Sequence, residues 1–407
     1  MPLLPPEKGA RTGKPPMLDV DFNRDPFIVI WEVTQACDLA CVHCRAEARP
    51  WRDSGELTTA EGKKLIDQIA EFGQPLFVIT GGDPLKRPDL FELIDYAVSK
   101  GLRTTLTPSG TRLMTPEVIK RLKEHGLSRL AVSLDGSCAA VHDEFRKVDG
   151  SFDWTIGSIK RARELDLPVQ INSTVCRLNL TDFDNIAELL KTLDIALWAV
   201  FFLVPVGRGI RSDIISAREH EVMLNKIYDW TKTLPFDIKT TAAQHYRRVV
   251  VQRMAAERAA AGESADPARP KIFTRLSATP GFSLGEVGRA AKGVNDANGF
   301  VFIGHTGDVC PSGFLPMSGG NVRERSLVDI YRNDPLFVDM RDYSKLKGKC
   351  GWCDFRDVCG GSRSRAYGVT GDVLASEPYC VYVPPRPPEL AKQLSAKEIA
   401  EAEAFIR

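Results

Sequence analysis

The chain has 407 residues, and its 54 Lys and Arg against 53 Asp and Glu leave a formal net charge of +1. This balance gives no electrostatic basis for binding nucleic acid or an anionic membrane surface, and no apolar run is long enough to span a bilayer. The length suffices for one large domain and a smaller one. Residues 1–26 lack the charged-then-apolar order of a signal peptide, so we expect a flexible leader and a cytoplasmic protein. In that reducing compartment, ten cysteines favour metal ligands over a disulfide framework.

A β-branched apolar run at 27–33 predicts a strand, and three cysteines follow it with the spacing C-x3-C-x2-C: Cys37, Cys41 and Cys44. Three thiolates can hold three corners of a [4Fe–4S] cluster, whereas an ordinary electron-transfer cluster takes four. The fourth iron is then open to a small chelating ligand. Zinc is the alternative, but zinc sites usually combine a C-x2-C pair with a second pair or with histidines. The nearest histidine, His43, lies inside the motif.

A second apolar run, 75–80, predicts a strand that ends at a glycine-rich turn, Gly81-Gly82-Asp83-Pro84. At this point the sequence resembles the radical S-adenosylmethionine (SAM) enzymes, in which a C-x3-C-x2-C loop follows the first strand and a Gly-Gly-Glu-Pro turn follows the second. Asp83 here is one methylene shorter than the family's glutamate. The resemblance implies a [4Fe–4S] cluster on the three cysteines, SAM at its open iron, and SAM contacts from the four residues of the turn.

Apolar runs alternate with amphipathic helical patterns from residue 27 to about 209, and a capping-box spacing at Thr58–Glu61 opens the first helix. Six strand-then-helix units imply a parallel sheet, because parallel strands need long crossovers. We therefore expect an α/β fold with a partial (β/α)6 TIM-like barrel over 27–210, which the resemblance also implies; a flat doubly wound sheet is the alternative. Later strands are predicted at 102–106, 129–133, 169–175 and 197–204, and later helices near 88–100, 116–125, 152–165 and 183–193.

Further SAM contacts are implied by the resemblance at the carboxyl ends of later strands. Ser109 stands in the asparagine position of the family's ribose-binding turn, and Ser133-Leu134-Asp135-Gly136 with a downstream arginine, Arg146, is similar to another family motif. A guanidinium suits the SAM carboxylate because it donates two parallel hydrogen bonds. The alternatives are a surface salt bridge for Arg146 and a packed loop histidine for His43. The implied contacts beyond the glycine turn are His43, Ser109, Ser133, Arg146, Asn172 and Leu203.

The periodic pattern weakens over 211–290, which we expect to form a helical connection over the barrel mouth. It contains an Ala- and Arg-rich helical stretch, 247–261, and a connection at 262–267. The run His245-Tyr246-Arg247-Arg248 can engage substrate carboxylates, since arginine pairs with them in bidentate geometry. A solvated basic turn is the alternative.

The segment 291–385 carries a second cysteine set: Cys350, Cys353, Cys359 and Cys380. The spacing alone is compatible with a zinc ribbon. Joined to a radical SAM domain, it resembles the SPASM extension, whose members hold one or two auxiliary [4Fe–4S] clusters. The resemblance implies one auxiliary cluster on these four cysteines, because Ser312 and the run Gly360-Gly361-Ser362-Arg363 replace cysteines that an inner cluster needs. Cys310 is interpreted as a packed thiol or as a cluster or substrate contact, Cys138 and Cys176 as structural, and 386–407 as a tail helix.

Several runs narrow the resemblance to the anaerobic haem b synthase branch, whose members remove propionate carboxylates from an iron porphyrin. The resemblance implies reductive cleavage of SAM, with flavodoxin or ferredoxin as electron donor, and oxidative modification of a substrate, with a tetrapyrrole as the leading candidate. The alternatives are a SPASM-type maturase of a ribosomally made peptide or a protein, and a non-catalytic iron–sulfur protein. The runs are 31–34, 43–46, 170–172, 203–209, 359–361 and 365–367.

Overall fold

The computed structural model describes residues 17–18, 20–262, 289–290 and 293–385. Strands within these residues form a sheet in the order β11-β10-β2-β3-β4-β5-β6-β7-β8. From β2 to β8, each strand is parallel to the next one along the chain. Their bounds are Ile28–Glu32 (β2), Leu76–Thr80 (β3), Arg103–Leu106 (β4), Arg129–Ser133 (β5), Val169–Val175 (β6), Leu197–Phe202 (β7) and Asp237–Thr241 (β8).

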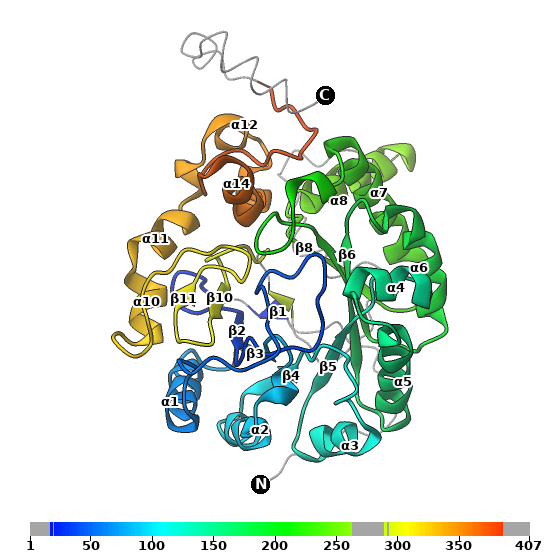
Figure 1. The fold of residues 1–407 in the computed structure, drawn as a ribbon. Coiled ribbons are helices and arrows are strands. Elements are labelled where there is room, and N and C mark those ends of the chain that lie inside the picture. The colour runs from blue at the N-terminus through cyan, green and yellow to red at the C-terminus, as the bar shows by residue number, and fades with distance from the viewer. Residues whose placement is uncertain (1–16, 19, 263–288, 291–292, 386–407) are drawn as a thin grey trace.

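Helices connect these strands, because a parallel pair needs a crossover that returns the chain to the same end of the sheet. They lie along the outer side of the curved sheet (Figure 1). Thr58 and Glu61 form the predicted capping box at the start of the first helix. The bounds are Thr59–Ala70 (α1), Leu90–Ser99 (α2), Pro116–Glu124 (α3), Ala139–Arg146 (α4), Ser151–Glu164 (α5), Phe183–Lys191 (α6), Ala217–Thr233 (α7) and Tyr246–Ala260 (α8), with 3-10 turns at Pro84–Lys86 (η1), Leu180–Asp182 (η2) and Arg211–Asp213 (η3).

The predicted partial barrel is confirmed, and the sheet extends beyond six strands at both edges. At one edge, β8 adds a strand within 211–290, the range expected to form a helical connection. Its sequence, Asp-Ile-Lys-Thr-Thr, has one apolar residue, so the hydrophobic pattern did not reveal it. At the other edge, β10 (Phe300–Ile303) is parallel to β2, and β11 (Val309–Cys310) is antiparallel to β10. The segment 291–385 therefore shares its sheet with the barrel.

The segment after β11 folds as short helices around buried charged groups. Arg363 and Arg365 are fully buried. Arg365 forms a two-point ion pair with Glu377, at 2.9 and 3.1 Å, which offsets the cost of removing both charges from water. The helices are Leu327–Asn333 (α10), Pro335–Arg341 (α11), Gly348–Gly351 (α12), Arg356–Cys359 (α13) and Arg363–Thr370 (α14), with a 3-10 turn at Tyr343–Lys345 (η4).

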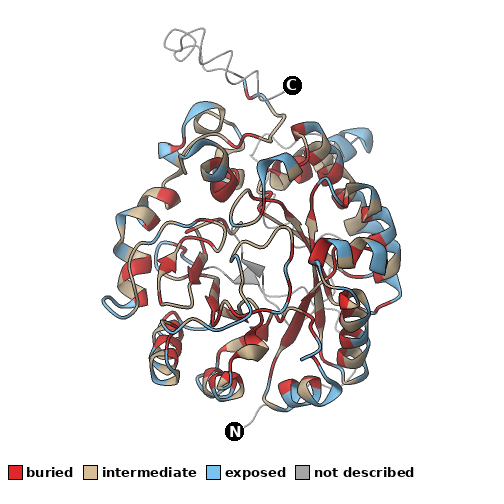
Figure 2. Ribbon diagram, in the orientation of Figure 1, coloured by how far each residue is buried: buried red, intermediate tan, exposed pale blue. Residues whose placement is uncertain are grey.

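Buried side chains gather on the strands and on the helix faces turned toward them (Figure 2). Trp31, Phe77 and Trp198 are fully buried members of the main core. None of the helices in the described part of the chain is long and apolar enough to cross a membrane. A short pair, β1 (Met17–Leu18) with β9 (Arg289–Ala290), is parallel.

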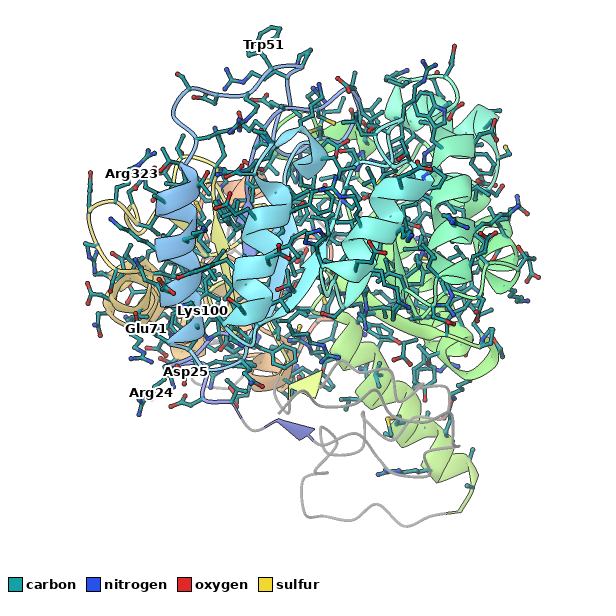
Figure 3. The ribbon with its side chains drawn as sticks, turned by 90° about the horizontal axis from the view of Figure 1, so that it is seen from below. Arg24, Asp25, Trp51, Glu71, Lys100 and Arg323 are labelled. Atoms are coloured by element: carbon teal, nitrogen blue, oxygen red, sulfur yellow. The ribbon has the colours of Figure 1, made fainter. Side chains whose placement is uncertain are left out.

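The two ends of the barrel are distinguished in Figure 3, where Trp51 lies at the end of the molecule opposite Arg24 and Asp25. Arg24 and Asp25 precede β2, whereas Trp51 lies in the loop between the end of β2 and the start of α1, after the three cysteines. The first cysteine motif therefore lies at the carboxyl end of the strands, where barrel enzymes carry their active sites. Most of the predicted leader, 1–16 and 19, and the predicted tail helix, 386–407, lie outside the described residues.

Candidate active site

The inner face of the sheet lines one cavity of about 670 Å³. Side chains alternate along a strand, so Leu76, Val78 and Thr80 of β3 line the cavity while Phe77 and Ile79 are buried in the core. The cavity is also lined by the three cysteines of the first motif and by most of the predicted SAM contacts: Cys37, Cys41, Cys44, His43, Gly81, Gly82, Ser109, Ser133, Arg146, Asn172 and Leu203.

Gly81 and Gly82 bring the turn after β3 against the backbone of the cysteine loop. The Gly82 N–H donates to the carbonyl of Thr34 at 2.7 Å, and the Asp83 N–H donates to the carbonyl of Ala36 at 2.6 Å. A β-carbon on Gly82 would lie 2.5 Å from the Ala36 oxygen. The pair of glycines therefore allows the close approach that holds the cysteine loop in place.

Asp83 and Pro84 do not line the cavity. The Asp83 carboxylate accepts hydrogen bonds from the Leu85 N–H at 3.2 Å and the Thr111 hydroxyl at 2.7 Å. Burial raises the pKa of this carboxyl group. The side chain thus stabilises the turn itself, and the shorter acid is compatible with that role.

Ser109 connects the first cysteine with the glycine turn. Its hydroxyl lies 3.2 Å from Cys37 Sγ and also hydrogen-bonds the carbonyl of Gly82. The Leu39 N–H donates to the same sulfur at 3.4 Å. Burial raises the pKa of the Cys37 thiol to about 11, so a metal must displace this proton when it binds.

Arg146 is buried rather than on the surface, so the surface-salt-bridge alternative is wrong. Its guanidinium pairs with the buried Asp135 and donates to Cys41 Sγ at 3.4 Å. Asp135 also accepts the backbone N–H of Thr174 at 2.6 Å. The Ser-Leu-Asp-Gly motif and its downstream arginine therefore form one buried pair against the cysteine loop.

His43 and Asn172 also line the cavity wall. The His43 ring packs on Phe145, with ring centroids 4.6 Å apart, and its Nδ1 is buried without a hydrogen-bond partner among the described residues. Burial lowers the pKa of His43 well below its ordinary value, so the imidazole is neutral. Asn172 accepts a hydrogen bond from Gln170 at 2.7 Å.

Arg208 is a site residue that we did not single out from the sequence, although it lies in one of the runs that carried the resemblance. Its guanidinium donates to the carbonyls of Cys41 at 2.9 Å and Ala48 at 3.2 Å. Its backbone N–H donates to the carbonyl of Cys44 at 2.9 Å. Gly207 has φ +58°, and a β-carbon there would lie 2.4 Å from the Cys44 oxygen. The loop after β7 therefore holds the cysteine loop through the Arg208 side chain and one backbone hydrogen bond.

Cationic side chains outnumber carboxylates on the cavity wall, and most of the remaining wall is apolar or aromatic. Phe201 and Phe314 contribute a ring pair with centroids 6.2 Å apart. Arg208 Nη2 is buried and has no hydrogen-bond partner among the described residues. The cations are Arg45, Arg129, Arg146, Arg208, Lys239 and Arg247, and the carboxylates are Asp237 and Asp296.

The four carboxyl-terminal cysteines line a second, small pocket, so the fold brings them together. Backbone N–H groups point at three of their sulfurs: those of Glu377 to Cys350 at 3.3 Å, Phe355 to Cys353 at 3.4 Å, and Gly361 to Cys359 at 3.4 Å. Such donors stabilise thiolates that carry an iron–sulfur cluster.

The described residues contain no group of three or more His, Cys, Asp or Glu side chains arranged to hold one metal ion. A [4Fe–4S] cluster has a different requirement, because each thiolate binds a different iron and the thiols surround a pocket rather than a point. The cysteine-lined pocket fits that requirement better than it fits the tetrahedral ligand set of a zinc ribbon.

The run 245–248 passes between the two pockets and is not the solvated turn that we considered as an alternative. His245 and Arg248 line the cysteine pocket, whereas Arg247 lines the central cavity. Arg247 donates to the carbonyl of Val358 at 3.2 Å, and burial lowers its pKa. This arginine is therefore engaged with the backbone of the second cysteine segment.

Serines at two positions that an inner auxiliary cluster would occupy are engaged in hydrogen bonds. Ser312 is buried and accepts from the Phe314 N–H at 3.2 Å, and Ser362 caps α14 through the Arg365 N–H at 3.2 Å. Cys310 and Cys176 line neither pocket, and burial raises the pKa of both thiols to about 12. These observations support their interpretation as packed thiols.

Comparisons with known proteins agree with this geometry. Residues 31–190 match the sequence profile of the radical SAM superfamily. The chain is 40% identical to AdoMet-dependent heme synthase of Methanosarcina barkeri, covering 90% of this chain and 99% of that protein. It is 32% identical to Fe-coproporphyrin III synthase of the same organism, with 91% and 92% covered. Among solved structures, Streptococcus suis SuiB bound to S-adenosylmethionine superposes with a TM-score of 0.64 at 16% identity, over 88% of this chain and 77% of that one.

Proposed function

This chain belongs to the radical SAM superfamily, within the family that includes AdoMet-dependent heme synthase, and from that premise we propose that it removes propionate carboxylates from an iron tetrapyrrole. As a member of the superfamily it is an enzyme that uses SAM and a [4Fe–4S] cluster. We assign the cluster to Cys37, Cys41 and Cys44, the three thiols on the wall of the large cavity. With SAM bound, such a cluster would supply the electron for reductive cleavage of SAM, the chemistry by which a hydrogen atom would be abstracted from the substrate.

The composition of the cavity wall is the observation that carries the substrate assignment. A tetrapyrrole has two apolar faces and carboxylates on its rim. The cavity is about 670 Å³ and largely apolar, and cationic side chains outnumber carboxylates on its wall. Arginine donates charge-assisted hydrogen bonds to carboxylates, and Arg208 Nη2 has no partner among the described residues and can donate one such bond. In this proposal Arg208 orients a propionate, and the cationic wall as a whole favours a substrate that carries carboxylates.

The predicted SAM contacts that line the cavity position the second substrate. Gly81 and Gly82 place backbone groups beside the cysteine loop, and Ser109 and Ser133 place hydroxyl groups on the same wall. Arg146 is held against the loop by Asp135. The barrel encloses these groups, which keeps water from a reactive intermediate.

We assign one auxiliary [4Fe–4S] cluster to Cys350, Cys353, Cys359 and Cys380, which line one pocket. With four thiolates, such a cluster is suited to electron transfer rather than to binding substrate. It would accept the electron left when a propionate loses a hydrogen atom and carbon dioxide. Flavodoxin or ferredoxin is the proposed donor to the first cluster.

Anaerobic reconstitution tests this function. The protein is loaded with iron and sulfide, reduced with dithionite, and incubated with SAM and iron-coproporphyrin III, and the products are analysed by mass spectrometry. Deoxyadenosine together with a tetrapyrrole that has lost carboxylates supports the proposal. Deoxyadenosine with an unchanged tetrapyrrole contradicts the substrate assignment and favours the alternative of a peptide maturase. Absence of SAM cleavage contradicts the cluster assignment.

A further inference from the structure

The pocket of the four carboxyl-terminal cysteines contains a buried imidazole that nothing in the proposed function explains. His245 lines this pocket and is 1% exposed. Neither of its ring nitrogens has a hydrogen-bond partner among the described residues. It also occupies the N-cap position of α8 without making a side-chain capping bond. A polar ring that is buried in this way loses its hydrogen bonds to water without compensation.

Other polar side chains on the pocket wall do have partners. Arg248 pairs with Glu221, and Glu377 pairs with Arg365. The Tyr382 hydroxyl donates to Asp354 at 2.9 Å, and the Lys349 ammonium donates to the carbonyl of Cys380. Arg248 Nε is also buried without a partner among the described residues, but the rest of that guanidinium is held by Glu221. On the described pocket wall, His245 differs in that neither of its polar atoms has a partner, so both are available to whatever the cysteines hold.

Aromatic packing fixes the position of the His245 ring. It packs on His220, with centroids 5.8 Å apart, and His220 in turn stacks on Phe202 and Tyr379, each at 5.2 Å. His220 donates from Nδ1 to the carbonyl of Ser216 at 2.9 Å, which fixes its own tautomer and orientation. A ring held by such packing is pre-organised toward the pocket rather than free to turn away.

We propose that His245 donates a hydrogen bond from a ring N–H to a sulfur of the auxiliary cluster and thereby raises the reduction potential of that cluster. The inference rests on the proposed function, since it requires a [4Fe–4S] cluster on the four carboxyl-terminal cysteines. His245 is a positioning and tuning residue, not a cluster ligand, because four thiolates already complete the ligand set.

The direction of the effect follows from charge. Reduction adds one electron to the cluster, so its sulfurs become more negative and accept a hydrogen bond more strongly. An N–H donor therefore stabilises the reduced form more than the oxidised form, and hydrogen bonds to the sulfurs are among the factors that set cluster potentials. A higher potential makes the cluster a better acceptor for the electron that leaves the substrate.

His245→Phe tests the inference, since it keeps an aromatic ring and removes the N–H. The fully loaded protein is titrated under anaerobic conditions and followed by electron paramagnetic resonance. The signal that SAM does not change is assigned to the auxiliary cluster. We expect the equilibrium constant for its one-electron reduction to fall about tenfold, which corresponds to a potential lower by about 59 mV. His245→Gln, which keeps an N–H donor, should recover part of the shift.

His142→Phe is the matched control, because it makes the same substitution in a buried ring that lines neither pocket and does not pack on His245. We expect no shift of the auxiliary potential in this variant. Equal shifts in both variants would overturn the inference, since they would indicate a general change in the surroundings of the cluster. An unchanged potential in a fully loaded His245→Phe protein would overturn it as well.

A measurement on the unmutated chain covers the case in which a variant does not load or fold. Protein labelled with ¹⁵N-histidine and reduced should show a nitrogen coupling to the SAM-insensitive cluster in pulsed electron paramagnetic resonance. A SAM-insensitive signal without this coupling contradicts the role of His245. Absence of any second cluster signal, with about four irons per chain instead of about eight, contradicts the proposed auxiliary cluster itself.

Discussion

The two cysteine pockets differ in ligand number, size and the origin of their hydrogen-bond donors. The first set has three cysteines on the wall of a cavity of about 670 Å³, and the second has four cysteines around a small pocket. Side chains from other strands and helices reach the first set, as Ser109 reaches Cys37 and Arg146 reaches Cys41. Backbone N–H groups of the same segment reach the second set.

This difference teaches that the first site depends on assembly of the whole barrel, whereas the second takes its cysteines and their backbone donors from one segment and receives His245 and Arg248 from another. It also matches the chemistry assigned to each, because a cluster held by three thiolates has an open iron and one held by four does not. Variants can therefore damage one site while the other remains loaded.

The largest expected effect is on the first site. Cys37→Ala removes one of only three proposed ligands, so deoxyadenosine formation should fall by more than the roughly 100-fold typical for loss of a residue that merely orients a ligand. Deoxyadenosine is measured by liquid chromatography after anaerobic incubation with SAM and dithionite. Cys176→Ala is the control, since that buried thiol lines neither pocket. Cleavage at the normal rate in Cys37→Ala would contradict the assignment.

Loss of the second site should separate the two halves of the reaction. In Cys353→Ala combined with Cys359→Ala, we expect deoxyadenosine to form while oxidised tetrapyrrole product is lost, because the electron from the substrate has no acceptor. The loss of the cluster can also unfold a small cysteine-rich segment, so circular dichroism and SAM binding are recorded on the same sample. Normal product from a folded double variant would rule out the electron-acceptor role.

The buried pair of Glu377 and Arg365 stabilises the segment that carries the second cysteine set, so we expect a variant at Glu377 to lower the stability of the protein. Glu377→Gln leaves Arg365 buried without its ion-pair partner, and breaking such a pair costs about 3–5 kcal/mol. We expect the loss in denaturant-induced unfolding of the loaded protein and a lower yield of the second cluster. Glu92→Gln, which removes an exposed partner of Lys63, should change stability by less than about 1 kcal/mol. Equal effects of the two variants would refute the structural role of the buried pair.

The smallest expected effect concerns the clamp on the first cysteine loop. Arg208→Lys keeps the positive charge but loses the geometry that reaches two carbonyls, and we expect about a tenfold loss of SAM cleavage, in the range for residues that orient metal ligands. Arg211→Ala, at an exposed position in the turn η3, should have no effect. An Arg208→Lys protein with a normal rate and a normal iron content would show that the clamp is dispensable.

The order of the barrel strands and the first cysteine motif were predictable because both depend on local patterns. Strands β2, β3, β5 and β7 are mostly apolar runs, β6 alternates apolar and polar residues, and β4 is bounded by Leu102 and Leu106, so all six were predictable from local patterns. The glycine turn was also recognisable, since the close approach of Gly82 to the carbonyl of Ala36 leaves no room for a side chain. Both features depend on residues that are adjacent in the sequence.

The remaining features depend on contacts between distant parts of the chain. Strand β8 carries polar residues on the cavity face, so it has no hydrophobic signature. Strand β10 pairs with β2 across more than two hundred residues, which no local pattern indicates. The same holds for His245 and Arg208, whose sequence neighbours give no sign that one faces a cysteine pocket and the other clamps a cysteine loop.

The central claim is that one cluster is open to SAM and the other is closed. Electron paramagnetic resonance of the reduced, fully loaded protein, recorded with and without SAM, tests it most directly. The account predicts two [4Fe–4S] signals, of which only one changes when SAM is added, and that one is absent from Cys37→Ala. A SAM-dependent change in the signal that disappears from the Cys353→Ala and Cys359→Ala double variant would contradict it.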